Sequence, residues 1–281
     1  MEANAIEIRG LTKHYRAFDL EALNLDLPYG CVLGLAGENG AGKSTTIRLI
    51  MNALERDGGT VKVLGVDNQS REFDSLKEEI GVVLDETFVP EVINAKQLGK
   101  IMAGTYKKWD QEAFDGWLDR FRLPADKKFK DYSRGMTMKL GIAAALSHHA
   151  RLLLLDEATG GLDPMVREEL LEMFADFAAQ DGHAVLLSSH IISDLERICD
   201  YIAFLHQGKL ILFEEKDALL DRCGILKCTK EQFANIPQEA VHGKRVGTYG
   251  VEALVEREFM PRDMVVDRAN LEDIILYLSK E

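Results

Sequence analysis

The sequence predicts an α/β fold built around a parallel sheet. Two short apolar runs, 152–155 and 184–187, have the length and continuity of buried strands. The segment 166–179 between them has a helical pattern, as the crossover between two parallel strands requires. A third apolar run, 32–36, leads through a glycine-rich loop into a helical stretch at 44–54. These three observations predict the centre of the molecule.

The first thirty residues predict antiparallel strands. Ile6 and Ile8 alternate with charged residues, and the leucines at 23, 25 and 27 alternate with polar residues before a turn at 28–30. Such alternation places the apolar side chains on one face of a strand. We therefore expect an antiparallel β subdomain here.

Two further elements flank the run 152–155. Upstream, the segment 110–121 predicts a helix within a helical subdomain at about 88–150, because its aromatic residues fall on one helical face. Downstream, 201–205 and 210–213 predict the two strands of a hairpin.

The last part of the chain predicts a small accessory or regulatory α/β domain at 226–281, after a main domain at 1–225. Its expected elements are a strand at 241–246, a helix with Val251, Leu254, Val255 and Phe259 on one face, a strand near 264–266, and a helix capped by Asn270 with Leu271, Ile274, Ile275 and Leu278 on one face.

The charge balance argues against a nucleic-acid partner. The chain has 34 Lys and Arg against 47 Asp and Glu, a formal net charge of −13. A field of this sign repels polyanions. The apolar runs are all far shorter than the ~20 residues that a membrane helix needs, so any membrane association is expected to come through another polypeptide.

The strongest motif is the run from Gly37 to Ser44, which matches G-x-x-x-x-G-K-[ST] between a strand and a helix. Glycines allow successive backbone N–H groups to face an oligophosphate, and the helix adds its positive end to the same anion. Lys43 is expected to bridge the β- and γ-phosphates of ATP, and the Ser44 hydroxyl to bind Mg²⁺. The predicted nucleotide ligands here are Gly37, Asn39, Gly40, Gly42, Lys43, Ser44 and Thr45.

A second motif lies at the end of the run 152–155. Two carboxylates, Asp156 and Glu157, follow this apolar strand. We expect Asp156 to hold the metal, and Glu157 to polarise a water molecule for in-line attack on the γ-phosphate. Together the two motifs predict ATP hydrolysis.

With these motifs, residues 5–220 resemble the nucleotide-binding subunits of ATP-binding cassette (ABC) transporters. The resemblance implies a P-loop NTPase cassette with an antiparallel β subdomain and a helical subdomain. It extends to three more segments: Tyr132-Ser133-Arg134-Gly135-Met136 at the signature position, Thr159-Gly160-Gly161-Leu162-Asp163-Pro164 at the D-loop, and Ser188-Ser189-His190 at the switch histidine.

The resemblance also implies site residues and a dimer. Two cassettes meet head to tail, and each ATP lies between the phosphate loop of one and the signature helix of the other. Ser133, Gly135 and Asp163 are then expected to contact the nucleotide of the second chain, and His190 its γ-phosphate and the attacking water. Tyr15 stands where the family stacks an aromatic ring on adenine. Phe18 is a nearby alternative, and packing of Tyr15 in the core is the other interpretation.

Two departures from the family pattern leave alternatives open. Asp85 stands where the family has a glutamine; it either ligates Mg²⁺ or serves a structural or membrane-domain contact. A carboxylate beside a γ-phosphate also adds like-charge repulsion. Arg134 replaces a signature glycine and either lies near phosphate or points to solvent, while Met136 replaces a glutamine. Ser133 and Gly135 remain, so the ATP sandwich is expected to survive.

Taken together, the sequence predicts the ATP-hydrolysing subunit of an ABC transporter of the bacterial exporter type. We expect a separately encoded membrane-spanning subunit, a homodimer of cassettes, and a cytoplasmic location at the inner face of the cell membrane. The alternative is a soluble ABC ATPase acting on ribosomes or DNA, which the charge and the lack of a basic linker disfavour. The sequence contains no Asn-Lys-x-Asp run for guanine, which argues against a GTPase.

Overall fold

The central layer of the molecule is a mostly parallel sheet. The computed structural model describes residues 4–85, 89–248 and 250–279. The strand order is β10-β9-β3-β8-β7-β6, and β10 pairs with β9 in the antiparallel sense. The strands are β3 (Val32–Gly37), β6 (Ile80–Val83), β7 (Leu152–Asp156), β8 (Ala184–Ser189), β9 (Tyr201–His206) and β10 (Lys209–Glu215). The predicted parallel strands and hairpin are thereby confirmed.

A second, antiparallel sheet packs over one face of the central sheet, with α1 (Lys43–Ile50) between the two. Its order is β2-β1-β4-β5, and its strands are β1 (Asn4–His14), β2 (Asp19–Pro28), β4 (Gly58–Val63) and β5 (Val66–Asp67). Ile6 and Leu25 from this sheet share one core with Leu154 of β7. The predicted antiparallel β subdomain is confirmed.

The opposite face of the central sheet is covered by helices. Leu155, next to Leu154 along β7, packs into a second core with Phe174 of α6. The helices of this region are α6 (Pro164–Ala178) and α7 (Ile192–Ile198). Short helical segments elsewhere are α2 (Glu72–Leu76) and the 3₁₀ turns Lys77–Glu79, Phe129–Asp131, Gln238–Ala240 and Arg257–Phe259.

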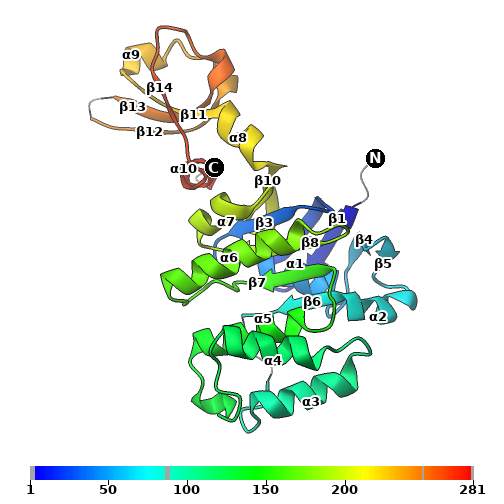
Figure 1. Cartoon of the computed structure of the whole chain (residues 1–281). Helices are drawn as coiled ribbons and strands as arrows, with labels where there is room; N and C mark the ends of the chain where they lie inside the picture. Colours follow the sequence, from blue (N-terminus) through cyan, green and yellow to red (C-terminus); the bar gives the residue numbers. More distant parts are fainter. Residues whose placement is uncertain (1–3, 86–88, 249, 280–281) are drawn as a thin grey trace.

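A helical subdomain is inserted between β6 and β7 and lies at one end of the molecule (Figure 1). Its helices are α3 (Ala95–Thr105), α4 (Gln111–Arg120) and α5 (Arg134–Leu146). Side-chain caps fix where they begin: Asn94 forms a capping box on α3, and Asp110 caps α4. Phe114 of α4 is fully buried, which confirms the predicted aromatic face.

The C-terminal unit lies at the other end of the molecule (Figure 1). It follows α8 (Lys216–Arg222) and contains a sheet of order β12-β13-β11-β14. The strands are β11 (Cys223–Cys228), β12 (Val241–Val246), β13 (Val251–Glu256) and β14 (Val266–Arg268). Its helices are α9 (Lys230–Phe233) and α10 (Leu271–Leu278). α10 returns to the cassette, where the Leu271 N–H donates to Glu196 Oε2 at 2.9 Å.

The helix predicted from Val251 to Phe259 is wrong, because residues 251–256 form strand β13. β13 is a central strand, buried on both faces. Val251 and Val255 pack into the core of the small domain, whereas Leu254 packs toward α10 and the cassette. Two-sided burial produced an apolar spacing that imitated a helical face. The strand expected near 264–266 lies at Val266–Arg268, and the Asn270 cap is confirmed.

Candidate active site

The phosphate loop leaves β3 and enters α1 in a tightly curled conformation. Gly40 and Gly42 have φ of +85° and +111°, in the left-handed region that favours glycine. A β-carbon on Gly42 would also lie 2.9 Å from the ring of Phe18. Ser44 and Thr45 lie half-buried in the first turn of α1, where the free backbone N–H groups of a helix bind anions.

Lys43 is held inside this loop. Its side chain is only 5% exposed, and Nζ donates to the carbonyl oxygens of Gly37 at 2.7 Å and Glu38 at 3.2 Å. Asn39 and Gly40, at the tip of the loop, are exposed. The tip of the loop is thus open to solvent, whereas the Lys43 side chain turns back and binds the carbonyl oxygens of its own loop.

Asp156 lies at the end of β7, buried between neighbouring strands. It accepts a hydrogen bond of 2.5 Å from the Ser188 hydroxyl, its partner in the register of β7 and β8. Sequence reasoning missed Ser188 as a support for the site. The available signal was a serine pair that ends the apolar run 184–187, next to His190.

Glu157 turns the chain sharply after β7. Its φ of +52° is unusual for a residue with a side chain, and its N–H donates to the Ser188 carbonyl at 3.1 Å. The His190 ring Nδ1–H donates to Glu157 Oε2 at 2.5 Å, and Lys43 Nζ lies 3.2 Å from Oε1. The structure therefore brings the three predicted catalytic residues together.

Glu157 Oε1 is a buried acceptor that pairs with Lys43 by charge but has no aligned hydrogen bond. The Thr159 hydroxyl is likewise buried without a hydrogen-bond partner. Buried polar atoms of this kind are rare in native proteins unless a ligand or water completes them. The site is therefore built to receive further polar groups.

The oxygen donors of the site suit Mg²⁺, which prefers carboxylate, hydroxyl and phosphate oxygens. Among the residues that the structure describes, no three acidic, histidine or cysteine side chains gather into a metal site of their own. Ser44 and Asp156 fit a metal whose remaining ligands come from nucleotide and water.

Asp85 is not gathered with these groups. Its carboxylate, 43% exposed, forms an ion pair with the guanidinium of Arg134. Arg134 is thus paired within its own chain. The sequence suggests two other placements for it, near phosphate or pointing to solvent. Metal ligation by Asp85 stays a prediction.

The signature and D-loop segments lie next to each other on the surface. Ser133 caps α5 by accepting from the Met136 N–H at 3.3 Å, and Asp163 caps α6 by accepting from the Met165 N–H at 3.0 Å. Both capping residues are exposed. Gly135 allows the two segments to approach closely, since a β-carbon at this position would lie 3.2 Å from Leu162.

Tyr15 and Phe18 lie side by side near the phosphate loop. Their ring centroids are 6.3 Å apart, but Tyr15 is 43% exposed whereas Phe18 is half-buried against Gly42. Lys13 Nζ lies 5.7 Å from the centre of the Tyr15 ring. An exposed ring has a face for stacking, so the geometry favours Tyr15 over Phe18 as the base-stacking residue and argues against a core role for it.

Comparison with known proteins identifies the family. The family model described as ABC transporter matches residues 20–160. The Bacillus subtilis (strain 168) ABC transporter ATP-binding protein YhcH is 31% identical over 288 residues, covering 98% of this chain and 91% of its own. This chain belongs to the ABC transporter family. As predicted, it is an ABC ATP-binding subunit, and it hydrolyses ATP.

Other ABC proteins agree in sequence and fold. The bacitracin transport ATP-binding protein BcrA of Enterococcus faecalis is 33% identical, covering 73% of this chain and 68% of its own. A solved ATP-binding subunit of an ABC transporter superposes with a TM-score of 0.70 at 26% identity, covering 82% and 93% of the two chains. The dimeric ATP-binding cassette MJ0796, bound to ADP and Pi, shares the fold with a TM-score of 0.67 at 21% identity and coverages of 75% and 98%.

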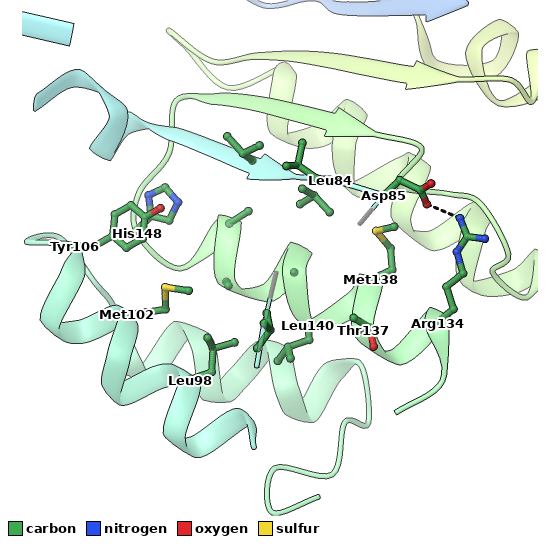
Figure 2. A pocket seen from close by; sticks show the side chains of 16 residues that line it. Leu84, Asp85, Leu98, Met102, Tyr106, Arg134, Thr137, Met138, Leu140 and His148 are labelled. Carbon is green, nitrogen blue, oxygen red and sulfur yellow. Dashed lines mark hydrogen bonds and ion pairs between the residues drawn. The ribbon is translucent and has the colours of Figure 1, made fainter. Parts of the chain in front are cut away.

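A largely apolar cavity of about 250 Å³ opens in this ABC subunit between β6 and the helical subdomain (Figure 2). Leu98 and Met102 of α3 face Met138 and Leu140 of α5 across it. The Asp85–Arg134 ion pair lies at one end, next to the signature helix (Figure 2).

The other end of the cavity is closed by stacked rings. Tyr106 and His148 have ring centroids 4.1 Å apart and planes at 13°. The His148 Nδ1–H donates to the Glu78 carbonyl at 3.0 Å, and burial lowers the pKa of His148.

Among the described residues, no helix is both long and apolar enough to cross a bilayer.

Proposed function

We propose that this chain drives an exporter by closing around ATP as a head-to-tail homodimer and hydrolysing it at Glu157. The observation that carries the proposal is the position of Glu157, held between Lys43 and His190 at the end of β7. A carboxylate fixed in this way is placed to polarise a water molecule for in-line attack on a γ-phosphate.

Lys43 changes partners when ATP binds. Its charge is neutralised by Glu157 and by loop carbonyls, and the β- and γ-phosphates take over these contacts. Release of Lys43 leaves the Glu157 carboxylate to accept from water, while His190 keeps it oriented. The tip residues Asn39 and Gly40, with the first turn of α1, enclose the phosphates through backbone N–H groups, and Tyr15 stacks on the base.

Mg²⁺ supplies positive charge that stabilises the transferring phosphoryl group. Ser44 and Asp156 hold it in our proposal, and the Ser188 hydroxyl fixes the rotamer of Asp156. Asp85 joins them as a ligand only if it gives up Arg134.

The remaining ATP contacts come from a second copy. We call Lys43, Ser44, Asp156, Glu157 and His190 the lysine half-site, and Ser133, Gly135 and Asp163 the serine half-site. The serine half-site is an exposed surface formed by the starts of two helices, whose positive ends attract phosphate. Each ATP then lies between the lysine half-site of one chain and the serine half-site of the other.

A separate membrane subunit completes the transporter in this proposal and keeps the chain at the cytoplasmic face of the membrane. We place its docking segment at the apolar cavity between β6 and the helical subdomain, which adjoins both Asp85 and the signature helix. A partner bound there contacts α5, so movements of the serine half-site are transmitted to it directly. Residues 226–281 form the accessory domain, which α10 anchors to the cassette.

The names of the relatives support a proposal for the class of cargo. They include ATP-binding proteins named for lantibiotic transport in Streptococcus pyogenes, 33% identical, and for daunorubicin/doxorubicin resistance in Streptomyces peucetius, 36% identical. We propose peptide-like or drug-like amphiphiles as exported substrates. Action on ribosomes or DNA is not favoured, since the net charge is −13 and these relatives are transport proteins.

The test is a Glu157→Gln protein, which retains the side-chain shape without the base. We expect ATP hydrolysis to fall by at least about 100-fold. Size-exclusion chromatography with light scattering should then show a stable dimer in ATP and Mg²⁺, and a monomer without nucleotide.

Glu169→Gln on the exposed face of α6 is the control and should behave as the parent. A Glu157→Gln protein that hydrolyses ATP normally, or that stays monomeric at saturating ATP, contradicts the proposal. The partner is tested by co-expression with multi-span proteins encoded next to this chain and joint purification from membranes.

A further inference from the structure

Arg134 and Asp85 join two segments that are distant in the sequence. Asp85 follows β6, and Glu157 follows the adjacent parallel strand β7 in the equivalent position. Arg134 is the first residue of α5, directly after Ser133. The ion pair, drawn in Figure 2, therefore joins the residue beside the Glu157 position to the start of the serine half-site.

The pair is weakly held. The Arg134 stem lies along the D-loop, where a β-carbon on Gly161 would be 3.6 Å from Arg134 Cδ. Beyond that contact the side chain is 61% exposed, and the Asp85 side chain is 43% exposed. An exposed ion pair contributes only about 0.2–1 kcal/mol. A stronger anion can therefore displace Asp85 from the guanidinium.

A triphosphate at Ser133 is such an anion. A guanidinium binds phosphate through paired, charge-assisted hydrogen bonds, which are stronger than contacts to a single solvated carboxylate. Arg134 also places a cation at the positive end of α5, where a triphosphate brings more negative charge than the single Asp85 carboxylate does. Both effects favour movement of Arg134 toward a nucleotide that reaches Ser133.

We infer that Asp85 holds Arg134 on its own chain, and that Arg134 transfers to the phosphates of the second chain's ATP when the two chains close. The inference rests on the proposed head-to-tail dimer. It makes Arg134 an additional nucleotide-binding residue of the serine half-site. It makes Asp85 the residue that sets how much ATP is needed for closure, because Asp85 competes with phosphate for the same guanidinium.

The experiment uses the Glu157→Gln chain and measures the ATP concentration that gives half-maximal dimerisation. Arg134→Ala should raise this concentration by about 10-fold or more, the effect of losing a hydrogen bond to a charged group. Asp85→Asn should lower it about threefold, since an exposed carboxylate no longer competes. The double variant should match Arg134→Ala alone, because Asp85 acts only through Arg134.

The exposed pair Arg120–Glu169, 3.1 Å apart and joining α4 to α6, provides the matched control. Arg120→Ala and Glu169→Gln should leave the concentration unchanged. An Asp85→Asn effect that persists without Arg134 would instead reflect repulsion between Asp85 and its own nucleotide, and it overturns the inference. So does an Arg134→Ala protein that dimerises as its parent does. A Glu157→Gln parent that stays monomeric overturns the proposed dimer itself.

Discussion

The main difference between the lysine and serine half-sites is how deeply their key side chains are buried. Lys43 and Asp156 are 5% and 3% exposed, and Lys43 Nζ and Asp156 Oδ1 have hydrogen-bond partners within the chain. Ser133 and Asp163 are exposed, and their oxygens serve mainly as helix caps. We propose that both regions bind phosphate, yet the key side chains of only one of them are buried within its own fold.

This difference separates binding from closure. A buried lysine and carboxylate must be paired, because desolvated charges are costly when left alone. Lys43 and Glu157 accordingly form an ion pair with each other. An exposed serine at a helix end needs no such arrangement, since water solvates it. The lysine half-site is thus expected to bind ATP unaided, and the serine half-site to contribute only when a second chain covers it.

Lys43→Ala should produce the largest effect and tests the first half of this comparison. It removes the cation that meets the transferring phosphate, so kcat/KM for ATP should fall by about 100-fold to 1000-fold, and binding of a fluorescent ATP analogue should be lost. Lys100→Ala, on the exposed face of α3, is the control and should change neither. Retained hydrolysis in Lys43→Ala would show that the buried network is only structural.

Ser133→Ala should have a smaller effect, confined to closure. Loss of one hydrogen bond to a charged group predicts a drop in ATPase activity of about 10-fold, with binding to the isolated chain unchanged. The substitution also removes the cap of α5, at about 1 kcal/mol of stability. Asn94→Ala removes the cap of α3 and controls for that loss. Equal activity losses in the two variants would reduce Ser133 to a helix cap.

The sequence indicates the residues of the lysine half-site but not the contacts that support them. A glycine-rich loop between a strand and a helix is a local pattern, so its residues identify it without knowledge of the fold. Ser188 and the Asp85–Arg134 pair depend on the register of β7 and β8 and on where α5 begins relative to β6. Those relations are set by tertiary packing, which periodicity does not encode.

The C-terminal domain illustrates the same limit. Burial on both faces of β13 erased the alternation that marks a half-buried strand, and a helical spacing appeared in its place. The last helix was predicted correctly because its signals are local: Asn270 caps it, and its apolar residues follow one face. In this domain the helix with local signals was recovered, whereas β13, whose burial is set by its neighbours, was not.

The smallest expected effect concerns His148. It tests whether the two half-sites lose their activity at the same pH. Burial lowers its pKa, with the neighbouring His149 adding to the shift and the Glu78 carbonyl opposing it. A depressed histidine pKa means that the unfolded chain binds more protons between the folded value and about 6.5. The contribution of His148 to stability is therefore complete above about pH 6.5 and is lost as the pH drops toward the folded value.

This loss should fall on the helical subdomain, because His148 stacks on Tyr106 after α3 and follows α5. On acidification, ATP-dependent dimerisation of the Glu157→Gln protein should weaken before ATP binding does, since the helical subdomain carries Ser133 but not Lys43. Urea unfolding at pH 7.5 and 5.5 should show a smaller difference for His148→Gln than for the parent. His149→Gln removes only the smaller contribution of an exposed neighbour, so it should reduce the difference less than His148→Gln does. If binding and dimerisation decline at the same pH, the two half-sites respond as a single unit.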